Sequence, residues 1–372
     1  MARFDTSGLD ALVADGTLPG YAVAARFGDD VELVSGGVRD VTSQVPFEVG
    51  TIHRVASLSK PVAALLTLQL VEDGTLALDE PIASWLPELA HLRVLSHPDA
   101  ELTDTVPLAR PILLRQLLTM TSGLGISMES TPLSRAMAEL GIHPSPAPPR
   151  IPAYEVLRAF AALPLAFQPG DGWAYHSSTD VLSLLLARAA KEDLEDLLER
   201  RVRVALELDV LGFCVTGTDV DRLATAYRPT ERGLAPRSPW GVGVPPLFRT
   251  LSAGLFATAA DVLAVFDELA RPVTIGAASA ALIRSPQVTE PVVRAAGPLL
   301  PPGYSYGCQV SVALEDDPAG PRAGSFGWSG GSGCLAVADQ RAARSGVLLT
   351  NRELGSPDGS PAFVPFLSAL YA

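Results

Sequence analysis

The chain is poor in three residue types that often mark function. Its 372 residues include three cysteines, five histidines and, among 28 basic residues, only two lysines. The cysteines stand far apart, so they form neither a C-x-x-C motif nor the dense framework of a disulfide-stapled domain. The histidines show no H-x-x-x-H or H-x-H spacing. Because zinc sites usually use such spacings, we expect no metal site.

Long apolar runs are also absent. No segment approaches the roughly 18 consecutive apolar residues that a membrane-spanning helix needs. The opening residues, "MARFDTSGLDALVADG", carry charges and lack the long apolar segment of a secretory signal. These two absences predict a cytoplasmic protein without a membrane segment.

Positive charge is in deficit as well. The formal net charge is −13 at pH 7, and an acidic surface repels the phosphates of nucleic acid. We therefore expect a small-molecule substrate as the partner and no nucleic acid. Apolar residues make up 48% of the chain and charged residues 19%, which is the composition of an ordinary globular protein. The oligomeric state stays open.

The two lysines differ in their sequence context. Arginine occupies the other 26 basic positions, and arginine does not lose its proton in proteins, whereas a desolvated lysine does. Lys191 lies in the polar stretch "AAKEDLED" and is expected to be a surface charge. Lys60 lies in the apolar stretch "RVASLSKPVAALL", where a neutral lysine has a chemical use.

Strand-like segments occur at both ends of the chain and helical segments in the middle. Residues 20–38 read as a β-hairpin, and the runs between 304 and 351 alternate strand-like stretches with turns. This order predicts an α+β fold, in which an antiparallel sheet built from both ends is flanked by helices. We assign 1–78 and 241–372 to this α/β domain and 79–240 to a mainly helical domain. The active site is expected in the cleft between them.

The stretch "FGWSGGSG" at 326–333 contains G-x-S-x-G, the pattern of a serine-hydrolase nucleophile elbow. Such an elbow needs a helix after the serine, and here the glycine-rich "GSGCLAVADQ" follows. The elbow's histidine also comes later in the chain, but the last histidine, His176, lies far upstream. We conclude that Ser329 is not the nucleophile.

A better nucleophile lies in "SLSK" at 57–60, where Ser57 and Lys60 form an S-x-x-K motif at an expected helix start. The i, i+3 spacing places both side chains on one helix face. The positive end of the helix and partial burial both lower the pKa of a lysine. A neutral Lys60 can then accept the Ser57 proton, as in Ser-Lys hydrolases. In the alternative, Ser57 only caps the helix and Lys60 is a surface charge.

Four segments resemble the serine β-lactamase-like superfamily in its class C branch, over about residues 10–370. This branch includes class C β-lactamases, D,D-peptidases, family VIII carboxylesterases and some acyltransferases. The segments, in the order of the family, are "RVASLSKPVAALLTLQLVEDGTLALDEPIASWLPEL", "LLRQLLTMTSGLG", "FQPGDGWAYHSSTDVL" and "SAGLFATAADVLAVFDEL". The later "FGWSGGSGCLAVADQRAARSGVLLTNR" resembles the strand pair that carries the third motif.

The resemblance implies a mechanism. Ser57 is the nucleophile, and Lys60 shares acid-base duty with Tyr175, which corresponds to the family's catalytic tyrosine. Tyr175 either relays the proton as a phenolate or only tunes Lys60. The backbone N–H groups of Ser57 and Gly331 are implied to form the oxyanion hole. An acyl-enzyme forms without any cofactor.

Two motif positions depart from the lactamase pattern. Ser177 stands where lactamases have Asn, and Trp328, Ser329 and Gly330 stand where they have Lys-Thr-Gly. We expect these four residues to contact substrate. An indole does not replace the lysine that attracts the carboxylate of a β-lactam. The Trp-x-Gly motif is similar to that of family VIII esterases and favours neutral esters or amides.

The leading interpretation is therefore a serine esterase that hydrolyses carboxylic esters through an acyl-enzyme on Ser57, with amides as a further class of substrate. Acyl transfer or peptide-amide chemistry at the same site is the alternative; β-lactamase activity and a non-catalytic binding role rank lower. We expect His176 to point away from the site and pack, and Trp328 to form an aromatic wall. Loops 126–152 and 228–250 are expected to line the cleft. Three further aromatic residues are expected to be core rather than cleft, namely Trp173, Trp240 and Phe248.

Overall fold

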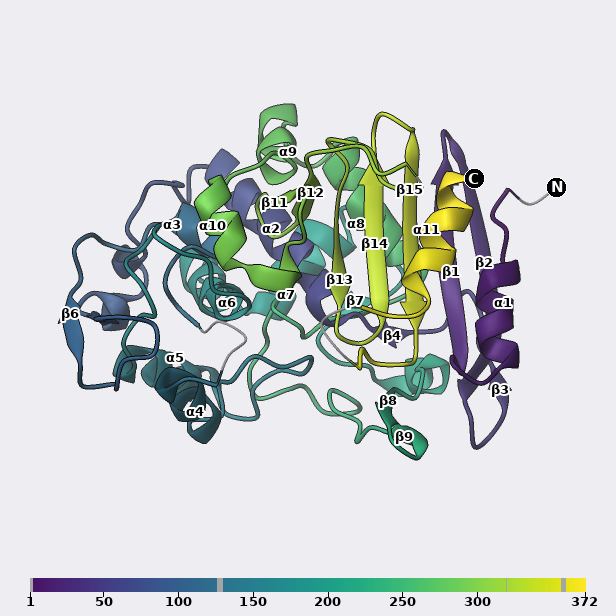
Figure 1. Cartoon of the computed structure of the whole chain (residues 1–372), viewed down its shortest axis with the longest axis horizontal. Helices are drawn as coiled ribbons and strands as arrows, with labels where there is room; N and C mark the ends of the chain where they lie inside the picture. The colour runs from purple at the N-terminus through teal and green to yellow at the C-terminus, as the bar shows by residue number, and fades with distance from the viewer. Residues whose placement is uncertain (1–2, 126–129, 319, 356–358) are drawn as a thin grey trace.

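The computed structural model describes residues 3–125, 130–318, 320–355 and 359–372. Its main feature is an antiparallel sheet with the strand order β11-β12-β13-β14-β15-β1-β2-β3 (Figure 1). The strand bounds are β1 Gly20–Phe27, β2 Asp30–Asp40, β3 Val45–Pro46, β11 Tyr304–Tyr306, β12 Ser311–Ala313, β13 Phe326–Gly330, β14 Cys334–Asp339 and β15 Arg344–Thr350. The first hairpin pairs with the last strand, β1 against β15. The predicted sheet of both chain ends is confirmed.

Both faces of the central strands are buried. In β1, Ala22 and Ala24 face the larger core, while Tyr21 and Val23 face a smaller one. This alternation follows from the two-residue period of a strand. Helices α1 and α11 cover the smaller core, and α8 packs against β14, β15 and β1 on the opposite face (Figure 1). The strand that carries Trp328 is thus held within a covered sheet.

Helices fill the middle of the chain and cover the sheet. Their bounds are α1 Ser7–Ala14, α2 Lys60–Glu72, α3 Leu114–Leu118, α4 Pro132–Glu139, α5 Ala153–Ala162, α6 Ser177–Ala190, α7 Leu194–Leu198, α8 Ala259–Ala270, α9 Ala277–Ile283, α10 Glu290–Ala295 and α11 Phe363–Tyr371. Helix α8 begins with the capping box that Thr258 and Asp261 predict. No helix in the described ranges is long and apolar enough to cross a membrane.

Short strands complete the fold. They are β4 His53–Arg54, β5 Arg93–Leu95, β6 Thr105–Pro107, β7 Leu211–Gly212, β8 Tyr227–Thr230, β9 Gly233–Pro236 and β10 Phe256–Ala257. A three-stranded sheet has the order β4-β10-β7, and its strand β4 lies just before the S-x-x-K segment in the chain. Two-stranded ribbons form from β5 with β6 and from β8 with β9. These ribbons lie in the region expected to be mainly helical and were not predicted. The two-domain division at 79 and 240 stays a prediction.

Candidate active site

The nucleophile candidate lies on a tight turn between a strand and a helix. Ser57 is in η1, a 3₁₀ turn over Ala56–Ser59 that leads directly into α2. Ala56 has a φ of 44°, a left-handed conformation that is unfavourable for a residue with a Cβ. The Ser59 hydroxyl stabilises the turn from within, because its Oγ donates to Ala56 O at 2.7 Å. The same Oγ accepts from the backbone N–H of Leu255 at 3.1 Å, which ties the turn to a distant segment. The fold therefore holds Ser57 in a defined position.

Lys60 faces Ser57 as the S-x-x-K spacing predicts. Its Nζ lies 3.1 Å from Ser57 Oγ and donates to the carbonyl oxygen of Ser252 at 2.5 Å. The same Nζ lies 4.6 Å from the centre of the Tyr175 ring. The lysine side chain is wholly buried, with 0% exposure. A surface role for Lys60 is thereby excluded.

Burial changes the acid-base character of Lys60. Removal from water disfavours the ammonium form and lowers the pKa of Lys60 to about 7, while the nearby carboxylate of Asp180 opposes this effect. A lysine with a pKa near neutrality is partly neutral at pH 7, and its neutral amine can accept a proton from Ser57 across the 3.1 Å contact. This is the property that a general base needs.

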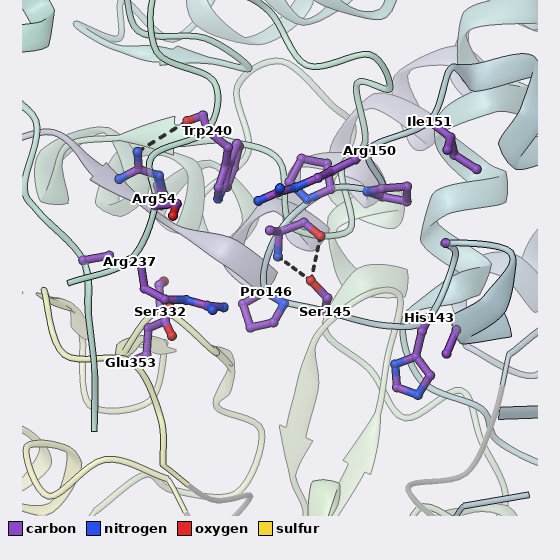
Figure 2. Close-up of a pocket in the computed structure, with 17 residues that line it drawn as sticks. Arg54, His143, Ser145, Pro146, Arg150, Ile151, Arg237, Trp240, Ser332 and Glu353 are labelled. Carbon is purple, nitrogen blue, oxygen red and sulfur yellow. Dashed lines mark hydrogen bonds and ion pairs between the residues drawn. The ribbon is translucent and has the colours of Figure 1, made fainter. Parts of the chain in front are cut away.

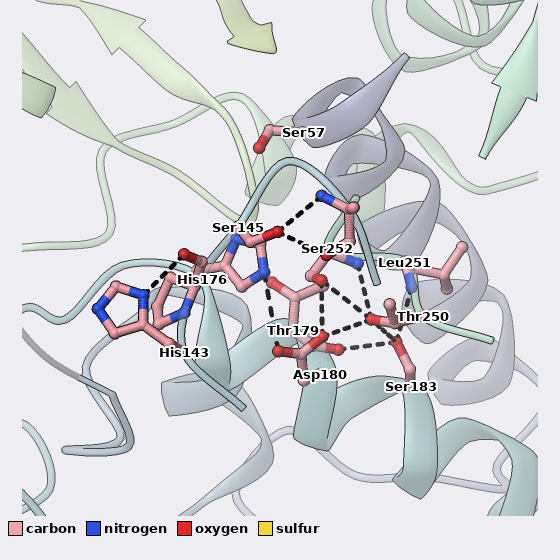
Figure 3. A network of polar contacts seen from close by, with 12 residues as sticks. Ser57, His143, Ser145, His176, Thr179, Asp180, Ser183, Thr250, Leu251 and Ser252 are labelled. Atoms are coloured by element: carbon pink, nitrogen blue, oxygen red, sulfur yellow. Dashed lines mark hydrogen bonds and ion pairs between the residues drawn. The ribbon is translucent and has the colours of Figure 1, made fainter. Parts of the chain in front are cut away.

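A buried network of hydrogen bonds links Lys60 to Asp180 through Ser252. Asp180, on α6, accepts hydrogen bonds at 2.6 Å from the hydroxyls of Thr250 and Ser252. Ser252 thus joins the two charges, since its carbonyl binds Lys60 and its hydroxyl binds Asp180. Figure 3 shows Asp180, Thr250 and Ser252 side by side. Burial raises the pKa of Asp180, and the hydroxyl donors and Lys60 oppose that rise.

His176 corrects one expectation. Its side chain does not point away from the site: Nδ1 lies 3.4 Å from Lys60 Nζ, and Nε2 lies 3.8 Å from Asp180 Oδ2. The residue has a φ of 81° immediately before α6, which turns the ring inward (Figure 3). Burial, and then the charge of Lys60, lowers the pKa of His176 well below its usual value. The neutral imidazole therefore bridges the lysine and the aspartate.

Tyr175 belongs to a group of four aromatic rings. Trp328 Nε1 donates to the phenol oxygen of Tyr175 at 2.6 Å, and the two ring centres lie 5.4 Å apart. Trp173 stacks on Tyr175 with a 15° interplanar angle, and Tyr306 packs edge-on against both tryptophans. Burial raises the pKa of Tyr175, while hydrogen bonds with Ser57 and Trp328 oppose that rise. Tyr175 is thus a neutral phenol at pH 7.

Glycine allows the third motif to approach the nucleophile. A Cβ placed on Gly330 would lie 2.7 Å from the Val55 carbonyl oxygen and 3.3 Å from the backbone nitrogen of Ser57. The end of β13 therefore lies against the Ser57 turn. Gly331, the next residue after this strand, follows directly after that contact. A Cβ on Gly331 would lie 3.0 Å from Pro146. The placement is compatible with the expected pair of oxyanion N–H groups, whose role stays a prediction.

The remaining predicted contacts have mixed positions. Ser177 is wholly buried at 0% exposure, and its hydroxyl has no hydrogen-bond partner among the described residues. Ser329 is half-buried on β13 and faces away from Trp328, because strand side chains alternate. Substrate contact by Ser177, Trp328, Ser329 and Gly330 stays a prediction. Trp173 and Phe248 are core as expected, whereas Trp240 is half-buried and lines a cavity.

That cavity, of about 600 Å³, lies beside the end of β13 (Figure 2). Part of its lining comes from the proline-rich segment 143–151, which forms no helix or strand. The expected cleft loops thus contribute some residues between 138 and 151 and three near 240, namely Arg237, Ser238 and Trp240, while 126–129 lie outside the described residues. Among the described residues, no cluster of three or more His, Cys, Asp or Glu side chains is placed to hold a metal ion.

Several functional candidates escaped sequence reasoning. The carbonyl of Ser252 is a backbone group and leaves no signal in the sequence. His176 lies just before α6 and Asp180 lies in its first turn, and the two meet only because of the positive φ of His176. The indole N–H of Trp328 reaches Tyr175 across 153 residues of sequence, a contact that only the fold creates.

Comparison with known proteins agrees with this geometry. Residues 8–364 match the profile of the Beta-lactamase family. Protein Rv1367c of Mycobacterium tuberculosis (strain ATCC 25618 / H37Rv) is 32% identical over 323 residues, covering 82% of this chain and 79% of its own. Esterase EstB of Burkholderia gladioli is 29% identical over 395 residues, covering 100% and 95%. The solved structure of EstCE1, "a hydrolase with promiscuous acyltransferase activity", superposes with a TM-score of 0.84 at 26% identity, covering 99% and 97%. By its matched residues and by its fold, the chain belongs to the Beta-lactamase family.

Proposed function

We propose that this protein is a serine hydrolase of carboxylic esters that works through an acyl-enzyme on Ser57. The observation that carries the proposal is the 3.1 Å approach of Lys60 Nζ to Ser57 Oγ, in which the lysine is wholly buried. The similarity to EstB and EstCE1, which are described as an esterase and a hydrolase, supports the same class of reaction. The chemistry needs no cofactor.

In the first step, Ser57 Oγ attacks the ester carbonyl and Lys60 takes its proton. Lys60 is suited to this task because burial brings its pKa to about 7. Tyr175 is less suited to be the base, since burial raises the pKa of its phenol. Tyr175 instead remains protonated, and its hydrogen bond with Ser57 places it to protonate the leaving alcohol.

The tetrahedral intermediate carries a negative oxygen that needs donors. The backbone N–H groups of Ser57 and Gly331 are proposed to bind it, since Gly330 lets β13 approach the Ser57 turn. As the alcohol leaves with the Tyr175 proton, Lys60 passes the proton that it took from Ser57 to the Tyr175 phenolate, so both groups regain their starting states. Water then attacks the acyl-enzyme and gives a proton to Lys60. Ser57 Oγ leaves with the Tyr175 proton, which Lys60 replaces. Ser57 is then released for the next cycle.

Short p-nitrophenyl acyl esters and a chromogenic cephalosporin provide the test. We expect the wild type to hydrolyse the esters, to act poorly on the cephalosporin, and to show a mass increase of one acyl group on Ser57 when quenched during turnover. Ser57→Ala should abolish both ester turnover and the acyl adduct. Ester hydrolysis that survives Ser57→Ala unchanged would overturn the mechanism.

Acyl transfer is the second candidate, favoured by the acyltransferase activity in the description of EstCE1. Added alcohols or amines then compete with water for the same acyl-enzyme. Transfer predicts that product release accelerates with the acceptor while acylation stays constant, and hydrolysis alone predicts no acceleration. The cytoplasmic location and the small-molecule partner stay predictions.

A further inference from the structure

The cavity beside the nucleophile carries an unusual charge for this chain. Three arginines line it, Arg54, Arg150 and Arg237, against one carboxylate, Glu353. The whole chain has a formal net charge of −13, whereas the side chains that line this cavity carry more positive than negative charge. Figure 2 shows Arg150 and Arg237 extending toward the middle of the cavity from opposite walls.

Arg54 is the most buried of the three, with 8% exposure. Its guanidinium lies between two aromatic rings, 5.5 Å from the centre of Trp240 and 5.2 Å from that of Phe256. Its hydrogen bonds to the carbonyls of Ala224 and Trp240 are long, at 3.5 and 3.3 Å. Its Nε is buried and has no partner among the described residues. The charge is thus oriented by ring stacking but left without an acceptor at Nε.

Only one of the three arginines has its charge balanced. Arg237 Nε donates to Glu353 at 2.9 Å. Within the described ranges, no carboxylate oxygen lies within ion-pair distance of Arg54 or Arg150. Burial lowers the pKa of Arg54 to about 10, and the negative charge of Glu353 opposes this effect without forming a direct ion pair with Arg54. A buried guanidinium without a direct ion-pair partner costs free energy. An anion in the cavity would supply the missing partner.

Residues next to the proposed catalytic groups in the chain line the cavity, although Ser57, Lys60 and Tyr175 do not. Arg54 is three residues before Ser57 on the same segment. Ser332, which lines the cavity, follows the proposed oxyanion donor Gly331 directly. Pro146, another lining residue, lies close to Gly331, since a Cβ placed on Gly331 would be 3.0 Å from its ring. We infer that a substrate bound at Ser57 can extend past Gly331 toward this cavity.

We propose that the cavity is an anion subsite, and that the natural ester carries a carboxylate or phosphate bound there by Arg54 and Arg150. The inference rests on the proposed ester hydrolysis and narrows its substrate class. It also revises the expected preference for neutral substrates, which considered only the loss of lysine at Trp328. The positive charge is present, but it lies beyond Gly331 rather than on the third motif.

Matched esters test the subsite. The substrates are 4-acetoxybenzoate, 4-acetoxyphenyl phosphate and the neutral 4-acetoxybenzamide, and the readout is the ratio of kcat/KM for each anion to that for the amide. Comparing one ratio between variants cancels the intrinsic reactivity of each phenol. The variants are Arg54→Gln, Arg150→Gln and the charge-preserving Arg54→Lys. Arg294→Gln, in an exposed ion pair on α10 outside the cavity, is the control.

We expect the wild type to prefer at least one anionic ester, and the preference to weaken as salt is raised. Arg54→Gln should lower the ratio about tenfold and Arg150→Gln about threefold, with partial rescue by Arg54→Lys and no change for Arg294→Gln. The anionic ester with the larger kcat/KM ratio to the amide shows whether the subsite prefers a carboxylate or a phosphate. Equal turnover of all three esters, or a preference unaffected by both glutamine variants, would overturn the subsite. Failure of all three esters, by contrast, would overturn the proposed ester hydrolysis.

Discussion

Trp328 donates its indole N–H to the phenol oxygen of Tyr175 across 2.6 Å. The bond joins the third motif to the residue that we propose protonates the leaving alcohol. It also gives Trp328 a task that an aromatic wall alone does not have. A donor at the phenol oxygen stabilises negative charge there, and this hydrogen bond opposes the rise in the Tyr175 pKa that burial causes. Trp328 thus tunes the acid strength of Tyr175 as well as filling space.

Replacing Trp328 by Phe tests this task, because it removes the N–H while keeping an aromatic ring. We expect kcat for an alkyl ester, whose alkoxide leaving group needs a proton, to fall about ten- to a hundredfold with KM changed little, since the lost bond acts on proton transfer. Steady-state kinetics of the purified variant provide the measurement. Tyr306→Phe is a matched control: Tyr306 packs on the same indole, and its hydroxyl has no partner among the described residues. An equal loss in both variants would contradict a specific role for the N–H.

The pH dependence of acylation reports on Lys60. Because its pKa is lowered to about 7, the base is neutral above this pH and protonated below it. We therefore expect kcat/KM to fall about tenfold per pH unit below a midpoint near 7. Lys60→Met should lower kcat about a thousandfold at all pH values. A profile whose midpoint lies near that of an ordinary lysine would contradict this assignment.

Asp180 sets the position of that midpoint. Its carboxylate attracts the Lys60 ammonium and so raises the pKa of the lysine against the effect of burial. Asp180→Asn removes the attraction but keeps an oxygen acceptor for Thr250 and Ser252. The midpoint of the pH profile should then move to lower pH, by about one unit. Asp196→Asn, an exposed aspartate on α7, should leave the midpoint in place. A shift to higher pH would contradict the electrostatic argument.

The sequence alone predicts those elements and residue pairs whose pattern lies within one short segment or repeats along the chain. The β1–β2 hairpin, the helix after Ser57 and the strands near 326–351 follow from alternation and turn residues. The Ser57–Lys60 pair follows from helical spacing, and the 3.1 Å approach confirms it. Tyr175 came from family resemblance, because nothing in its own neighbourhood distinguishes it from a core tyrosine.

The rest depends on contacts that the fold creates. His176 enters the site because its backbone adopts a φ of 81°, a conformation that a histidine in sequence does not announce. The arginines of the cavity come from segments near 54, 150 and 237, and no periodicity relates them. The ribbons β5–β6 and β8–β9 are too short for a pattern of alternation to develop, so they appeared as turns between helices.

Gly330 is required by the close contact between β13 and the Ser57 turn. A Cβ there would lie 2.6 Å from Cys334 Sγ and 2.7 Å from Val55 O, so Gly330→Ala must push the strand or the turn aside. We expect a loss of about 1–3 kcal/mol in unfolding free energy and a large loss of acylation rate. Gly50→Ala is the control, because the added Cβ would meet a nitrogen of the flexible Arg222 side chain at 3.5 Å, an ordinary contact distance. Urea unfolding and burst kinetics provide the measurements, and full activity in Gly330→Ala would contradict the tight contact.

His53 makes the fold sensitive to acid. It is fully buried on β4 with Nδ1 2.7 Å from the Arg54 carbonyl, and burial lowers its pKa to about 4. The unfolded chain therefore binds a proton at higher pH than the folded chain. The stability that this difference confers is complete above the unfolded pKa of 6.5 and is lost as the pH falls toward 4. The 2.5-unit difference between 6.5 and about 4 corresponds to about 3 kcal/mol.

His53→Asn removes the titrating ring and keeps an N–H near Nδ1. Unfolding free energies from urea titrations should then decline less between pH 6.5 and 4 than those of the wild type. Part of the decline remains in this variant, because burial also lowers the pKa of His176. His97→Asn, which changes an exposed histidine, should keep the wild-type decline. The unfolded His53→Asn chain takes up no proton at position 53. If this variant nevertheless loses stability in acid as steeply as the wild type, the His53 imidazole is not the group that links folding to pH.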